Sequence, residues 1–126
     1  MSAKMPLFDI PSSATVRKAQ EARWLELTRV ALPALAAPRD WLLRDDHCFQ
    51  RVLLDAACGG CWYDHIPRRP AYAHAPDAVL DRAIAIAIAI GEALVAGAAD
   101  LVPLEKQSRR WRAARPAAMA TAVRLS

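Results

Sequence analysis

The fold of this chain is decided by residues 77–97, which read DAVLDRAIAIAIAIGEALVAG. The alternation of alanine and isoleucine over residues 83–90 has the period of two that is typical of a β-strand. A helix is favoured because Pro76 and Asp77 suit the first turn of a helix and Gly97 suits its end. We therefore predict a helix over about residues 77–96.

This predicted helix is apolar on two sides, because successive residues turn by about 100° around a helix axis. One side carries Leu80, Ile84, Ile88 and Val95, and the opposite side carries Val79, Ile86, Ile90 and Leu94. Such a helix needs neighbours on both sides or a second copy of the chain. We predict an all-α protein, a compact bundle of about four helices with this doubly apolar helix in the centre, and we predict a homodimer.

Two further helices precede the central one. Residues 13–32 follow a serine cap and carry apolar side chains at helical spacing, and Pro33 is expected to kink or end this helix. Residues 46–58 form the second, because Asp45 and Asp46 suit its positive end. Gly59 then supplies the left-handed residue that commonly ends a helix. A fourth helix is expected between Asp100 and Pro116.

The chain of 126 residues has the size of one domain. We predict an irregular leader over residues 1–12, one helical domain over residues 13–115 and a frayed tail over residues 116–126. The apolar run at residues 83–90 is too short to cross a bilayer, and no secretion signal is evident. A cytoplasmic protein without a membrane partner is therefore expected.

All three cysteines and two of the three histidines lie within residues 45–65. Candidate metal ligands are His47, Cys48, Cys58, Cys61 and His65. Zinc prefers four ligands of these types in a tetrahedron, and a Cys-x-x-Cys turn can supply two of them. However, only one such pair is present, and buried cysteine is common in cores. Packing is favoured, so we predict that the purified protein carries no stoichiometric zinc or iron.

A polar row on the predicted helix 46–58 is the second candidate site, because its members follow one another at four-residue steps. With neighbours across the turn it could bind a small polar or anionic ligand, or perform acid–base chemistry. The full candidate set is Asp46, His47, Arg51, Asp55, Trp62, Tyr63, Asp64 and His65. The simpler interpretation is favoured: Arg51 and Asp55 pair along the helix, and the cluster anchors the loop that follows.

The C-terminal segment is the most basic part of the chain. Its cationic cluster around an aromatic residue comprises Arg109, Arg110, Trp111, Arg112 and Arg115. Cations that alternate with a stacking ring can bind nucleic acid. Cations are also favoured near the C-terminal end of any helix, and the tryptophan is equally suited to a core. Nucleic acid is therefore a possible partner, but not the favoured one.

Three segments carry a resemblance to a known group: DDHCFQR (residues 45–51), CGGCWYDHI (58–66) and QSRRWR (107–112). Over about residues 15–112 the chain resembles small bacterial proteins that are assigned to the GNAT acetyltransferase superfamily. That resemblance implies a mixed sheet, acetyl-CoA as cofactor and acyl transfer as activity. The chain has four glycines and none in the Gly-x-Gly pattern of the superfamily's pyrophosphate loop.

The function predicted from these observations is a small, non-catalytic binding or interaction module. Its working surface would be the helix over residues 46–58 and the loop over residues 59–75. The alternatives are a metal-dependent or acyl-transfer enzyme, and a nucleic-acid accessory protein that acts through the basic C-terminus. No cofactor is favoured, and zinc and acetyl-CoA are the alternatives.

Overall fold

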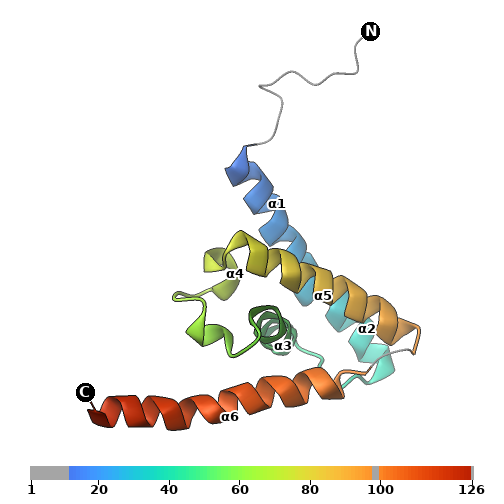
Figure 1. Cartoon of the computed structure of the whole chain (residues 1–126). Helices are drawn as coiled ribbons and strands as arrows, with labels where there is room; N and C mark the ends of the chain where they lie inside the picture. Colours follow the sequence, from blue (N-terminus) through green and yellow to red (C-terminus); the bar gives the residue numbers. More distant parts are fainter. Residues whose placement is uncertain (1–11, 98–99, 126) are drawn as a thin grey trace.

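The structure is a computed structural model that describes residues 12–97 and 100–125, with side chains up to Ala114. Within these ranges it contains helices and no strand, which confirms the all-α prediction. The bundle consists of one long helical segment over residues 13–39 and of α3 (Asp46–Cys58), α5 (Asp77–Val95) and α6 (Val102–Leu125) (Figure 1). No helix among the described residues is long and apolar enough to cross a membrane.

The first helical segment consists of α1 (Ser13–Leu25), a π-helical turn η2 (Glu26–Ala31) and α2 (Leu32–Arg39). Ser12 caps it, because its hydroxyl accepts a hydrogen bond from the Thr15 N–H at 3.1 Å. The helix does not end near residue 32, because the segment continues to Arg39, whereas the predicted kink at Pro33 stays a prediction. Pro33 lies in the first turn of α2, where a missing N–H is tolerated, and η2 has already shifted the hydrogen-bond register before it.

Helix α3 begins and ends at the predicted residues. Gly59 has a φ of 68°, in the left-handed region, and its N–H donates to the Ala56 carbonyl at 3.3 Å. The helix contacts α5 on one side and α6 on the other, and it also contacts η2 and α2. Figure 1 looks along its axis and shows α3 between α5 and α6. Side chains of α3 can therefore reach most of the other elements.

Helix α5 has packed neighbours in α1, η2 and α3. Its buried residues are Leu80, Ala83, Ala87, Gly91 and Leu94, whereas the four isoleucines are half-buried. Ala83 and Ala87 thus lie on the most buried face of α5, whereas Ala85 and Ala89 are exposed. Small side chains allow close approach: a Cβ atom on Gly91 would lie 3.3 Å from Cδ2 of Leu32.

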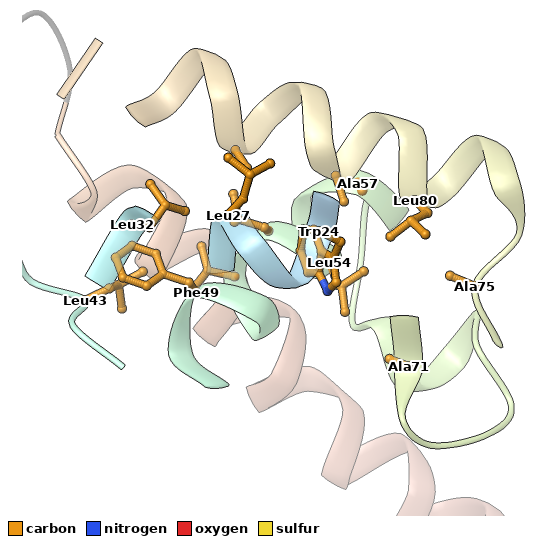
Figure 2. Packing of buried hydrophobic residues seen from close by; sticks show 14 of the residues in the cluster. Trp24, Leu27, Leu32, Leu43, Phe49, Leu54, Ala57, Ala71, Ala75 and Leu80 are labelled. Atoms are coloured by element: carbon orange, nitrogen blue, oxygen red, sulfur yellow. The ribbon is translucent and has the colours of Figure 1, made fainter. Parts of the chain in front are cut away.

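The core is a single apolar cluster built around Trp24, which is fully buried. Figure 2 shows Trp24 together with Leu54 of α3 and Leu80 of α5. A polar contact joins α1, η2 and α3: the buried Thr28 hydroxyl donates to the Trp24 carbonyl at 2.9 Å and accepts from the Gln50 amide at 3.0 Å. The π-helical turn is therefore tied directly to α3.

Helix α6 starts after Asp100, whose Oδ1 accepts from the Val102 N–H at 2.5 Å, as expected of a cap. The predicted end before Pro116 is wrong, because the helical backbone continues to Leu125. A proline inside a helix removes one hydrogen bond and crowds the preceding turn, but it does not oblige the chain to leave the helix. The frayed tail over residues 116–126 stays a prediction, and the leader over residues 1–11 lies outside the described residues.

Candidate functional site

A cleft of about 300 Å³ opens where α3, residues 62–72 and α6 meet. Helix α3 contributes His47, Gln50, Arg51 and Leu54 to its lining. The spacing places these four side chains on one side of the helix, because residues three and four positions apart share a face. This wall of the cleft therefore combines one apolar side chain with three that can form hydrogen bonds.

The opposite wall comes from the segment between α3 and α5, which contains a 3-10 turn, η3 (Trp62–Asp64), and a short helix, α4 (Ala71–His74). Its side chains that line the cleft are Trp62, Tyr63, Arg69, Pro70, Ala71 and Tyr72. The Trp62 and Tyr63 rings meet edge to face, with centroids 4.3 Å apart. This wall is mainly apolar and aromatic.

Two guanidinium groups lie against the Tyr63 ring. The Arg69 guanidinium carbon is 4.9 Å from the ring centroid, and that of Arg112, from α6, is 4.7 Å from it. Arg69 also lies over the Trp62 ring, at 5.6 Å from its centroid. The negative face of an aromatic ring attracts cations, so these rings help to hold positive charge at the cleft.

The fully buried carboxylate of Asp55 fixes both walls from behind. It accepts from the Trp62 N–H at 2.9 Å and from the Ser108 hydroxyl at 2.6 Å. Arg112 donates to it through Nε at 2.9 Å and Nη2 at 3.1 Å. One carboxylate thus holds the segment after α3 and the helix α6 against α3.

A second buried carboxylate, Glu105, fixes Arg51. Arg51 Nη2 lies 2.9 and 2.8 Å from the two Glu105 oxygens, and its Nη1 donates to the Ser108 hydroxyl at 2.8 Å. Arg109 also donates to Glu105, at 2.6 Å. Burial favours a raised pKa for Glu105, but hydrogen bonds from both arginines outweigh it and hold the pKa below its ordinary value. Glu105 is therefore a stable anion at neutral pH.

These contacts correct one sequence prediction and support another. The predicted pairing of Arg51 with Asp55 along α3 is wrong, because both side chains bind residues of α6 instead. The rule for residues four apart treats a helix in isolation, whereas α6 offers each of them a buried partner. The expected anchoring of the loop is confirmed by the hydrogen bond from the Trp62 N–H to Asp55.

The predicted ligand-binding residues separate into three groups. His47, Arg51, Trp62 and Tyr63 line the cleft, and Asp55 lies behind it. Asp46 accepts from the His47 N–H and does not line the cleft, nor do Asp64 and His65. The predicted ligand-binding set missed seven residues of the lining: Gln50, Leu54, Arg69, Pro70, Ala71, Tyr72 and Arg112. Only Gln50 and Leu54 carried a local signal, because they share a helix face with His47.

The predicted metal ligands are not all brought together. Among the described residues, Asp45, His47 and Cys48 form a group whose possible ligand atoms lie within 4.8 Å of one another. Cys58, Cys61 and His65 do not belong to it, and exposed groups of this kind are common without a metal. Burial, followed by the charge of Asp55, raises the pKa of the Cys58 thiol, which disfavours the thiolate that a metal needs. The predicted absence of zinc and iron stays a prediction.

The basic cluster of α6 is divided by its surroundings. Arg112 and Arg109 bind Asp55 and Glu105, whereas Arg110 is exposed and Trp111 is half-buried. Burial alone would lower the pKa of Arg112, but hydrogen bonds to Asp55 and Tyr63 raise it. The side chain of Arg115 lies outside the described residues. Two of the candidate nucleic-acid contacts are therefore already used within the fold.

Comparisons of this chain with protein-family models, with curated proteins and with solved structures find no match. The resemblance to GNAT-assigned proteins stays a prediction for that reason. All three segments that carried the resemblance contribute to the cleft or to the groups behind it. Residues 45–51 supply Gln50 and Arg51, residues 58–66 supply Trp62 and Tyr63, and residues 107–112 supply Ser108 and Arg112. Function is therefore argued from the cleft.

Proposed function

We propose that the protein is a small, non-catalytic binding module and that the cleft between α3, residues 62–72 and α6 is its binding site. The observation that carries this proposal is the convergence of polar, aromatic and cationic side chains from three elements on one cavity of about 300 Å³. Ligand sites are typically concave and mainly apolar, with a few placed polar groups, and this volume lies at the small end of their range.

The fixed position of the walls supports binding. Asp55 joins the Trp62 backbone to Arg112, and Glu105 joins Arg51 to α6, so neither wall has to form when a ligand arrives. A site that is ordered in advance loses less conformational entropy on binding. The buried ion pairs are therefore useful to a binding site even though such pairs contribute little net stability.

The same contacts make catalysis by the buried acids a poor explanation. Asp55 already accepts hydrogen bonds from three groups, and the lowered pKa of Glu105 keeps this acid ionised at neutral pH. A general acid or base needs a pKa near the working pH and access to the substrate. Both carboxylates instead act as structural supports for the residues that line the cleft.

A fragment screen followed by amide chemical-shift mapping tests the proposal. We expect the fragments that bind to shift resonances of α3 and residues 62–72 together. Tyr72→Ala removes part of one wall and should lower the affinity of these fragments at least five-fold. Leu42→Ala, at an exposed apolar residue that does not line the cleft, is the control and should leave binding unchanged. Shifts confined to other surfaces, or no binding at all, would refute the proposal.

We further propose that the module works in the cytoplasm as a homodimer. The half-buried isoleucines of α5 support the dimer, because they leave apolar surface on a helix that already packs α1 and α3. Ile86→Glu would then convert the dimer to a monomer in light scattering at high micromolar concentration. A wild-type protein that is already monomeric under those conditions would rule the dimer out.

A further inference from the structure

We infer that the ligand of the cleft is a small aromatic acid with a single negative charge, whose carboxylate binds Arg69 and whose ring lies against the aromatic wall. This inference rests on the function proposed above, since it assigns a chemical class to the ligand of the same cleft. Four properties of the lining lead to it: the charge balance, the position of Arg69, the aromatic wall and the free acceptor of the Gln50 amide.

The charge balance favours a monoanion. Among the described residues, three guanidinium groups line the cleft, those of Arg51, Arg69 and Arg112, and no aspartate or glutamate does. Arg51 and Arg112 are ion-paired with the buried carboxylates of Glu105 and Asp55, and Arg109, which shares Glu105, does not line the cleft. Arg69 is the cation that remains for a ligand, and one cation in a partly enclosed site matches one negative charge.

The position of Arg69 suits a carboxylate. Its guanidinium carbon lies 5.6 Å from the centroid of the Trp62 ring and 4.9 Å from that of the Tyr63 ring, so cation–π contacts with both rings hold the group at the aromatic wall. The N–H donors of a guanidinium point outward in its plane, where two of them can bind the two oxygens of one carboxylate. An arginine held by two aromatic rings has less freedom than one on an open surface, which favours directional binding over loose charge attraction.

The apolar part of the lining suits an aromatic ring. Trp62, Tyr63 and Tyr72 stand on one side of the cleft and Leu54 on the other, and Pro70 and Ala71 add small apolar surfaces. Aromatic rings in contact prefer offset or edge-to-face arrangements, which several rings in one wall can provide. The volume of about 300 Å³ limits the ligand to one or two rings.

Gln50 adds a requirement for a donor on the ligand. The Thr28 hydroxyl donates its proton to the Trp24 carbonyl, so the Gln50 contact to Thr28 must come from the amide nitrogen. The Gln50 carbonyl oxygen then remains as an acceptor on the side chain that lines the cleft. A hydroxyl or ring N–H on the ligand would satisfy it. The class is therefore an aromatic monoacid that carries a hydrogen-bond donor.

Calorimetry with 4-hydroxybenzoate tests this inference, with 4-hydroxybenzamide as its neutral counterpart. We expect the benzoate to bind at least ten-fold more tightly than the benzamide. Arg69→Gln should remove that difference, because it deletes the charge and leaves the rings. Arg68→Gln is the matched control: it makes the same charge change one residue away, at a side chain that does not line the cleft.

The possible results separate the two proposals. Equal binding of the neutral and charged probes, mapped to the cleft, would overturn the inference and leave the binding function intact. Tighter binding of phenyl phosphate than of the benzoate would overturn the single negative charge. Loss of the preference in Arg68→Gln as well as in Arg69→Gln would overturn the role of Arg69. If the fragment screen also finds no ligand for the cleft, the binding function and the inference fail together.

Discussion

Helices α5 and α6 both pack on α3, yet they do so through opposite chemistry. The buried residues of α5 are Leu80, Ala83, Ala87, Gly91 and Leu94. The buried residues of α6, among its described side chains, are Glu105 and Ser108. Apolar packing has no preferred direction and supplies most of the stability of a fold, whereas hydrogen-bonded ion pairs are directional. We conclude that α5 stabilises the bundle and that α6 positions Arg51 and Arg112 at the cleft.

The largest expected effect is on the α5 side. Leu80→Ala removes a fully buried side chain and leaves a cavity, so the free energy of unfolding should fall by about 3 kcal/mol. Val95→Ala is the control on the same helix, because Val95 is 49% exposed and should change stability by less than about 0.5 kcal/mol. Urea denaturation measures both. Similar losses in the two variants would contradict the assignment of stability to the buried face.

An intermediate effect is expected on the α6 side. Arg112→Gln leaves the buried Asp55 carboxylate without its cation and should lower the free energy of unfolding by about 2 kcal/mol. Arg110→Gln, at an exposed neighbour, should have almost no effect. The loss in Arg112→Gln should shrink when Asp55→Asn is also present, because the two groups act on each other. Strictly additive losses in the double variant would show that the pair is not coupled.

The smallest expected effect depends on pH. The pKa of Glu105 is lower in the folded state than in the unfolded chain, where it is about 4.3. The ionised side chain therefore contributes to stability above pH ~4.3, and this contribution is lost as the pH falls through the pKa of the folded state. Glu105→Gln should therefore cost about 1 kcal/mol at pH 7 and make the loss of stability below pH ~4.3 shallower. Glu92→Gln, on the exposed side of α5, is the control. Parallel acid titrations of the wild type and Glu105→Gln would contradict this role.

What the sequence predicted well depends on local signals. The bounds of α3 were predictable from the acidic residues at its start and from Gly59 at its end; Asp45 forms no capping hydrogen bond through its side chain, but the charge of Asp46 suits the first turn. The helical state of residues 83–90 was also predictable, because Pro76, Asp77 and Gly97 outweigh the alternation of isoleucine and alanine. Short-range rules suffice where the deciding atoms are close in sequence.

What the sequence did not predict depends on contacts between distant residues. Arg112 binds Asp55 across 57 positions, and nothing in the basic segment distinguished it from Arg110. Arg69 and Tyr72 lie in a segment with several prolines, where no periodicity indicates which side chains turn inward. Seven of the eleven described residues that line the cleft were therefore absent from the predicted ligand-binding set.

The π-helical turn η2 has a consequence for the phase of the first helical segment. Trp24, Thr28, Leu32 and Ala36 are all buried and lie four residues apart. In a regular α-helix, each of these side chains would be displaced around the helix axis by about 40° from the one before it. In η2 the Leu32 N–H reaches back five residues to the Leu27 carbonyl, and this wider turn takes up part of the displacement. Deleting one residue between Glu26 and Ala31 would rotate the two ends of the segment by about 100° relative to each other. Either Trp24 or Leu32 would then face solvent, so substitutions at the exposed positions Glu26, Arg29 and Val30 should be tolerated far better than a change in length.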